Sequence, residues 1–115
     1  MKIIYDSKKV EKAFSSEYIK SWRYPEKVKR KLVAMENFIV AADSFNDLIV
    51  FPSYRCHQLK GDRAGEWSLY VGNTGYRVTL IPCDDDGKKI IDGDIIAQCK
   101  FIKIVVVTEV SNHYE

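Results

Sequence analysis

Two residues in the middle of the chain, His57 and Arg77, have side chains suited to cleaving a phosphodiester bond. Lys60 and Arg63 lie near them, in a glycine-containing turn between two apparent strands. RNA cleavage by attack of the 2′-hydroxyl needs a base, a cation that stabilises the charged phosphorane, and an acid for the leaving oxygen. An imidazole and a guanidinium supply the first two, and this route needs no metal. We expect Lys60 and Arg63 to bind RNA beside them.

A second histidine, His113, lies near the end of the chain and is followed by Tyr114. Both side chains can transfer protons, and histidine titrates near neutral pH. A chain end is also a place where residues fray. The sequence therefore leaves two readings open for this pair, proton transfer during catalysis or a tail without a role.

Four cations crowd the first turns of a long helix that we predict over residues 25–42. They are Lys27, Lys29, Arg30 and Lys31. The helix dipole disfavours positive charge at this end, by about 0.3–1 kcal/mol for each exposed side chain. A cluster placed against this preference indicates contact with phosphate groups, and the alternative is a solvated charged face. We include all four among the candidate RNA-binding residues.

The net charge of +2 is unevenly distributed along the chain. Residues 1–83 carry 14 basic and 9 acidic side chains, whereas residues 84–94 carry five aspartates against two lysines. A basic body favours a polyanion such as nucleic acid as partner, and the alternative is an ordinary soluble surface. The acidic stretch would repel RNA. We therefore expect it to project away from an RNA-binding face, or to bind a basic surface of a partner.

The first half of the chain is predicted to be helical after a short opening strand at residues 2–5. Asp6 or Ser7 could cap a first helix. The clearest periodic signal lies in residues 25–42, where Pro25 suits the first helical position. Apolar residues recur there every three or four positions, at Val28, Leu32, Met35, Ile39 and Ala42. Residues 44–48 could add another turn of helix.

From residue 54 onward the pattern changes to strands, which we predict over residues 54–59, 66–71, 76–82 and 101–110. Gly72–Gly75 has the composition of a hairpin turn. If Trp67 and Val78 pack on the helices, Ser68 and Arg77 point to the opposite face of the sheet. The fold class is therefore α+β, with N-terminal helices packed on a twisted antiparallel sheet of about four to five strands. We expect a single domain over residues 1–115.

Composition sets limits on the class of protein. The chain has 115 residues, of which 46% are hydrophobic and 30% charged, which excludes wholesale disorder and a coiled coil. Its apolar runs are too short to span a bilayer, and it opens without the apolar region of a secretory signal, so we expect no membrane partner and a cytoplasmic location. Three cysteines without a CxxC pair, and two distant histidines, indicate neither a disulfide framework nor a metal site. No cofactor is expected.

The segment from Tyr54 to Ser68 resembles the HigB-like branch of the RelE/ParE bacterial toxins. Members typically show a tyrosine-arginine pair, a histidine, Leu-Lys-Gly-Asp-Arg, a glycine and Trp-Ser, and then a strand with an arginine after an aromatic residue. The corresponding residues in this chain are Tyr54-Arg55, His57, Leu59-Lys60-Gly61-Asp62-Arg63, Gly65, Trp67-Ser68 and Tyr76-Arg77. Chain length and the order of helices and strands agree as well, so the resemblance covers most of residues 1–115.

The resemblance implies a RelE-like fold and a toxin of a type II toxin–antitoxin system, which cuts mRNA in the ribosomal A site without a metal. His57 matches the family histidine on the strand before the turn. Lys60 matches a basic residue expected to contact phosphate, and Arg77 an arginine expected to stabilise the transition state. His113 falls near the C-terminal catalytic histidine of the family. Either histidine would be the base, and the other histidine or Tyr114 the acid.

The partners implied by the resemblance are the ribosome, mRNA and a cognate antitoxin, HigA-like, with a helix-turn-helix domain. Two alternatives stay open: a ParE-like toxin that poisons a topoisomerase, and a decayed toxin that only binds its antitoxin or RNA. The second alternative arises from the end of the chain. Many members end in Asp-Tyr-His, whereas this chain ends in Ser-Asn-His-Tyr-Glu. Residues 84–100 are also longer than the turn usual in the family.

Overall fold

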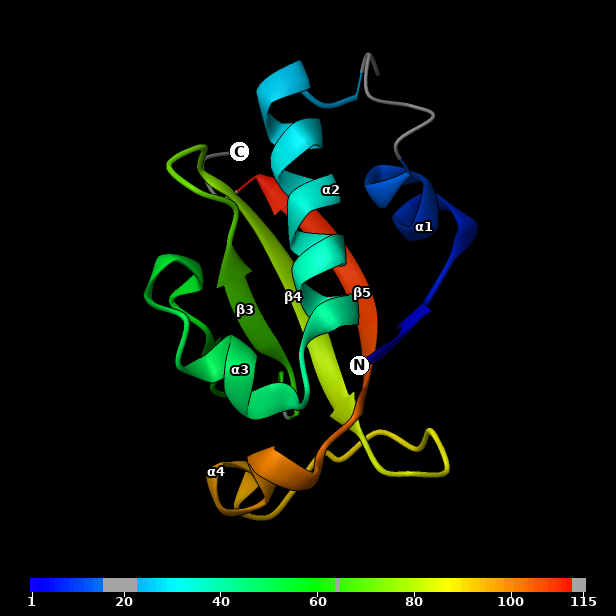
Figure 1. The fold of residues 1–115 in the computed structure, drawn as a ribbon, viewed down its shortest axis with the longest axis vertical. Helices are drawn as coiled ribbons and strands as arrows, with labels where there is room; N and C mark the ends of the chain where they lie inside the picture. Colours follow the sequence, from blue (N-terminus) through cyan, green and yellow to red (C-terminus); the bar gives the residue numbers. More distant parts are fainter. Residues whose placement is uncertain (16–22, 64, 113–115) are drawn as a thin grey trace.

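Helices lie on one face of a five-stranded sheet in the computed structural model, which describes residues 1–15, 23–63 and 65–112 (Figure 1). The prediction of an α+β fold with helices packed on a sheet is confirmed. None of the helices in these three ranges is long and apolar enough to cross a membrane. The candidate residues His113 and Tyr114 lie outside the described residues.

The order of the elements follows the predicted one, with helices first and most strands later. They are β1 (Lys2–Tyr5), α1 (Lys8–Phe14), α2 (Glu26–Ala41), α3 (Phe45–Ile49), the 3-10 turn η2 (Pro52–Tyr54), β2 (His57–Gln58), β3 (Trp67–Tyr70), β4 (Tyr76–Cys83), α4 (Ile95–Gln98), the 3-10 turn η3 (Cys99–Phe101) and β5 (Ile104–Asn112). The order across the sheet is β1-β5-β4-β3-β2.

The sheet is mixed, whereas the sequence suggested an antiparallel one. Strands β2 to β5 pair antiparallel, but β1 lies parallel to β5, with Lys2 opposite Ile104. Parallel neighbours need a long crossover connection, and here nearly the whole domain separates the two strands. The pairing partner of β1 is therefore fixed by the packed domain and not by a local turn.

The helix predicted over residues 25–42 is present as α2 and supplies much of the core. Its residues Leu32, Met35 and Ile39 are fully or almost fully buried, as the periodicity predicted. They pack against the inward side chains of the sheet, among them Leu69 and Val78. Burying one such side chain contributes about 1.5–3 kcal/mol. The contact between α2 and the sheet therefore decides which sheet face is left for function.

The strand predicted over residues 54–59 is much shorter in the structure. Only His57 and Gln58 form β2, because Pro52 begins a 3-10 turn and Arg55 adopts a left-handed conformation with φ of 46°. Such a conformation costs a residue other than glycine about 1–2 kcal/mol. The left-handed Arg55 therefore breaks the extended chain and redirects it into β2.

The segment between β4 and β5 contains a short helix, α4, which we did not predict from the sequence. Asp94 caps α4 by accepting a hydrogen bond from the Ala97 amide at 3.2 Å. The aspartates at positions 84–86 begin directly after the last residue of β4, at the end of that strand opposite to Arg77. At 3.3 Å per residue, this places them roughly 20 Å from Arg77 along the strand. The three aspartates therefore lie away from Arg77, as expected, whereas residues 90–91 of the same segment lie against Gly65, in the turn that carries Lys60 and Arg63.

Candidate functional site

Four strands each bring one side chain into a row on the sheet face opposite the helical core. Strand pairing places His57 beside Ser68, Ser68 beside Thr79, and Thr79 beside Glu109. The neighbours of these residues, including Leu69 and Val78, point into the core. Directly paired residues share a sheet face. The four polar side chains therefore form one row across β2, β3, β4 and β5.

A second row lies one step closer to the hairpin between β3 and β4. In this row Tyr70 pairs with Arg77, and Arg77 pairs with Ser111. We use the term polar sheet face for the two rows together. Its residues are His57, Ser68, Thr79, Glu109, Tyr70, Arg77 and Ser111. The prediction that Arg77 and Ser68 share the face opposite the helices is confirmed.

A β-bulge in β5 sets which residues of that strand belong to the polar sheet face. Val107 pairs with Leu80 and is buried in the core, whereas Glu109 pairs with Thr79. Thr108 is the extra residue between these pairs, and its hydroxyl donates to the Thr79 carbonyl at 3.2 Å. One extra residue reverses the alternation of side chains that follow it. The bulge therefore turns Glu109 and Ser111 onto the polar sheet face.

His57 is exposed and is oriented by a backbone hydrogen bond. Its Nδ1 lies 2.7 Å from the carbonyl oxygen of Arg55. A carbonyl oxygen only accepts hydrogen bonds, so Nδ1 carries the proton. In the neutral ring Nε2 then has the lone pair, and no described residue donates to it. A neutral His57 would therefore offer Nε2 as the ring nitrogen that can accept a proton.

Tyr70 lies among three nitrogen-bearing side chains, those of His57, Arg55 and Arg77. The Arg77 guanidinium donates to the Tyr70 hydroxyl at 3.0 Å, and its central carbon lies 4.3 Å from the centre of the Tyr70 ring. The Arg55 guanidinium lies 5.3 Å from the same ring, and the His57 ring 6.2 Å from it. Cations within about 6 Å of an aromatic ring are attracted to it. Tyr70 thus gathers His57, Arg55 and Arg77 into one cluster.

Both guanidinium groups of this cluster have their charge available. Neither Arg55 nor Arg77 makes an ion pair with a carboxylate in the part of the chain that the structure describes. Two unpaired cations beside an imidazole favour an anion such as a phosphate. Sequence reasoning missed Arg55 and Tyr70 as site residues. The signals were present, because Arg55 belongs to the motif and Tyr70 follows Ser68 by two residues on the same face.

A polar cavity of about 320 Å³ adjoins the cluster at the hairpin. It is lined by Arg55, Tyr70, Arg77 and the turn residues 72–76. Lys31 reaches this hairpin from α2, since a Cβ built on Gly72 would lie 3.0 Å from the Lys31 Nζ. Of the four predicted helix cations, the structure thus brings Lys31 to the edge of the site.

The remaining three helix cations are placed differently. Lys27 is exposed, and Arg30 pairs with Glu26 at 2.8 Å; both line a shallow depression on α2. Lys29 was wrongly predicted as a phosphate contact, because its side chain has no exposed surface. Its ammonium donates to the carbonyl oxygens of Lys12 and Ala13, at 2.8 and 2.6 Å, and so caps the end of α1. Burial lowers the pKa of Lys29.

The two cations of the turn after β2 differ in the same way. Lys60 is exposed and lies beyond the end of β2. Arg63 donates from Nε to Glu66 at 2.7 Å and lies 3.7 Å from a carboxylate oxygen of Glu109. The hydrogen bond to Glu66 raises the pKa of Arg63. Arg63 is therefore paired with two carboxylates, whereas Lys60 forms no ion pair with any residue that the structure describes.

The described part of β5 ends at Asn112, opposite Tyr76 and one residue from the pair of Ser111 with Arg77. The roles predicted for His113 and Tyr114 stay predictions. Among the residues that the structure describes, no three His, Cys, Asp or Glu side chains are grouped so that they could hold a metal ion. No model of a protein family matches the sequence, and a search of curated proteins found no match either.

Proposed function

We propose that this protein is the toxin of a type II toxin–antitoxin system and acts as a ribosome-dependent endoribonuclease on mRNA. The observation that carries the proposal is the cluster around Tyr70, where an imidazole whose Nε2 accepts from no described residue lies beside two guanidinium groups that pair with no described carboxylate. The sequence motif around His57 supports it independently. The proposal places the protein in the cytoplasm, where ribosomes and mRNA occur.

In the proposed reaction, the 2′-oxygen of a ribose attacks the adjacent phosphorus, and the bond from phosphorus to the 5′-oxygen breaks. The His57 Nε2 takes the proton of the 2′-hydroxyl, which is a role worth about 10²–10⁴-fold in rate. Arg77, with Arg55 beside it, stabilises the charge that develops on the phosphorane. An acid returns a proton to the 5′-oxygen, so the products are a 2′,3′-cyclic phosphate and a 5′-hydroxyl. His113 or Tyr114 is the proposed acid.

Tyr70 acts in this scheme as a positioning residue. Its hydroxyl accepts the hydrogen bond from Arg77, and its ring lies against both guanidinium groups. An arginine held by two such contacts loses little conformational freedom when a phosphate binds. The ribosome would supply the remaining order by aligning the mRNA backbone for in-line attack. A cognate antitoxin, HigA-like, is the proposed inhibitor.

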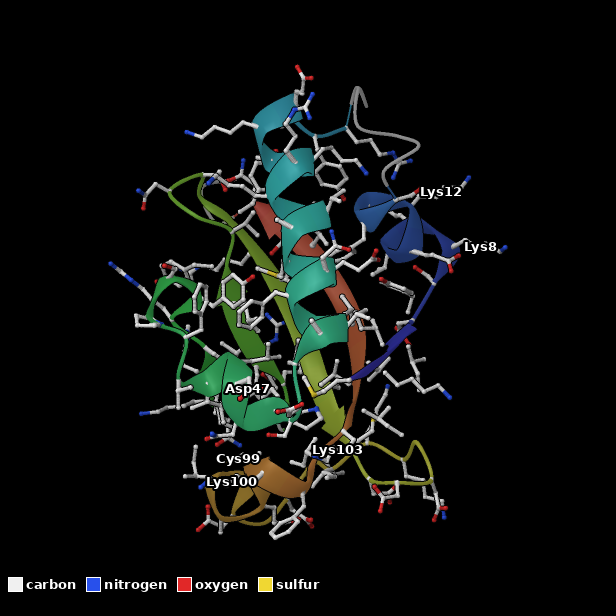
Figure 2. The ribbon with its side chains drawn as sticks, viewed as in Figure 1. Lys8, Lys12, Asp47, Cys99, Lys100 and Lys103 are labelled. Carbon is white, nitrogen blue, oxygen red and sulfur yellow. The ribbon has the colours of Figure 1, made fainter. Side chains whose placement is uncertain are left out.

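The test is inducible expression in bacteria, with growth recorded and reporter mRNA analysed by primer extension. Wild-type protein should arrest growth and produce discrete cuts within the reading frame. His57→Ala and Arg77→Ala should abolish both effects. Lys100→Ala is the matched control, because this lysine is an exposed cation on η3, outside the polar sheet face (Figure 2).

The other outcomes separate the alternatives. Growth arrest without mRNA cuts would refute the nuclease and favour a topoisomerase poison. No arrest from folded, well-expressed protein would favour a decayed toxin that only binds. Cuts that persist in both variants would show that the cluster around Tyr70 is not the catalytic site.

A further inference from the structure

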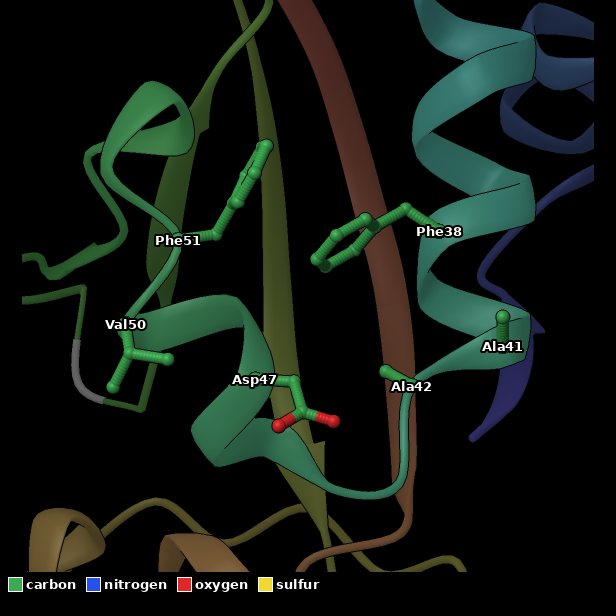
Figure 3. Close-up of a pocket in the computed structure, with 6 residues that line it drawn as sticks. All are labelled: Phe38, Ala41, Ala42, Asp47, Val50 and Phe51. Atoms are coloured by element: carbon green, nitrogen blue, oxygen red, sulfur yellow. The ribbon is translucent and has the colours of Figure 1, made fainter.

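A second cavity, which none of the residues of the polar sheet face lines, lies where α2 ends and α3 begins. It has a volume of about 370 Å³ and is lined by Phe38, Ala41, Ala42, Asp47, Val50 and Phe51 (Figure 3). The rings of Phe38 and Phe51 lean together with centroids 4.7 Å apart, and the carboxylate of Asp47 lies below them in this view. The cavity thus combines apolar walls with one charged group.

The rim of the cavity is apolar and open to solvent. Val50 is 62% exposed there, which makes it one of five large apolar side chains that the described residues leave exposed. Clustered apolar surface around a hollow is typical of an interaction site. The aromatic pair Phe38 and Phe51, which lines the same cavity as Val50, would gain further buried area if a partner covered it.

Asp47 gives this cavity a definite charge preference. One of its carboxylate oxygens accepts from the Asp43 amide at 2.8 Å, and Asp47 forms no ion pair with any described residue. Two nearby cations donate to backbone carbonyls and not to Asp47: Lys103 donates to the Asp43 carbonyl at 2.8 Å, and the Met1 ammonium donates at 2.7 Å to the carbonyl of Ala42, which lines the cavity. The charge that complements the cavity is therefore positive.

We propose that this cavity binds an arginine side chain, with an apolar neighbour, presented by a segment of a partner protein. A guanidinium stacks on aromatic rings and pairs with a carboxylate through two hydrogen bonds, which fits Phe38, Phe51 and Asp47. Lysine fits less well, because its compact ammonium is strongly hydrated, cannot stack flat on a ring and does not match a carboxylate bidentately. The apolar neighbour covers Val50. The proposal does not depend on the nuclease activity, since binding alone tests it.

The probe is a capped 12-residue helical peptide of alanine and glutamine that carries leucine and arginine four positions apart. This spacing places both side chains on one helix face. Titration followed by amide NMR shifts should give saturable changes confined to the cavity residues. Exchanging the peptide arginine for glutamine should weaken binding about tenfold, as expected for loss of a charge-assisted hydrogen bond. Asp47→Asn in the protein should have the same effect.

The exchange of the peptide arginine for glutamine and Asp47→Asn in the protein form a double-mutant cycle. If the guanidinium contacts Asp47, making both changes together should cost little more than either one alone. Asp47→Asn retains an oxygen that can accept from the Asp43 amide, so α3 should keep its start. Val50→Ser should also weaken binding. Val40→Ser is its matched control, because Val40 is 59% exposed on α2 but does not line the cavity.

Four results would overturn the proposal. The arginine and glutamine peptides could bind equally well, or the two changes could prove additive. Shifts could fall on the polar sheet face, which carries its own carboxylate in Glu109. A concentration-dependent dimer that Val50→Ser abolishes would identify a second copy of this chain as the occupant instead.

Discussion

Replacing Gly65 by alanine should destabilise the protein by about 2–5 kcal/mol, because two separate costs fall on one residue. Gly65 has φ of +83°, which costs a residue with a side chain about 1–2 kcal/mol. The new methyl group would also lie 2.9 Å from the Ile91 Cα and 3.2 Å from the Ile90 carbonyl oxygen. Both are backbone atoms, which no side-chain rotation can move away, and such overpacking costs about 1–3 kcal/mol.

Gly61→Ala is the matched control, since Gly61 lies in the same turn with φ of +79° and a Cβ there would meet no atom within 4 Å. It should cost only the conformational part, about 1–2 kcal/mol. The difference between the two variants therefore isolates the clash with residues 90–91, predicted at about 1–3 kcal/mol. Such a clash would show that residues 90–91 pack tightly against the turn between β2 and β3, which contains Gly65.

Urea denaturation of both variants, followed by circular dichroism, measures this difference. The midpoint should fall further for Gly65→Ala, with the slope unchanged. In thermal scans the difference should amount to roughly 4–12 °C. Equal losses in both variants would refute the reasoning, since they would mean that the backbone at residues 90–91 yields without cost.

Three further predictions concern the site and the ionisable groups. Arg77→Lys should reduce mRNA cleavage at least tenfold, since a lysine cannot keep the Tyr70 contacts and also bind phosphate bidentately; wild-type cleavage by primer extension would contradict this. Burial raises the pKa of the Cys56 thiol to about 12 from 9.0, so Ellman's reagent at pH 8 should react with it roughly a thousandfold more slowly in native protein than in urea. Burial also raises the pKa of Tyr54 to about 12 from 10.0. Tyrosine in the unfolded chain ionises first. The free energy of unfolding therefore keeps its full value below pH 10 and falls as the pH rises toward 12. Tyr54→Phe should flatten that loss in urea titrations; an unchanged pH profile would contradict the assignment.

The amino-acid pattern was enough to predict most helices and strands and the orientation of their faces. The period of residues 25–42 placed Leu32 and Ile39 in the core, because a helix repeats every 3.6 residues and one stripe must be buried. The alternation through β3 and β4 placed Arg77 on the sheet face opposite to that of Val78, because successive side chains of a strand point to opposite faces. His57 and Arg77 could be named as candidate site residues from the sequence, because the motif contains His57 and strand alternation puts Arg77 on the face opposite the core.

Which of the candidate cations are available depends on contacts between distant segments of the chain. Lys29 and Lys31 are two positions apart on α2, yet one caps α1 and the other reaches the hairpin. Arg63 is engaged by Glu66 and by Glu109, which is far away in sequence. Such contacts join segments whose separation along the chain carries no information about their distance in space. Charge alone could therefore not tell a phosphate contact from a buried cap.

Tertiary structure also determines which residues belong to the polar sheet face and its cluster. Simple alternation from Val107 would place Glu109 in the core, and the bulge at Thr108 reverses it. Tyr70 becomes the centre of the cluster only because Arg55 leaves the extended conformation and turns the chain back beside it. The physical reason is the same in both cases. Periodic patterns record local geometry, whereas a bulge or a left-handed residue is stabilised by the packing around it.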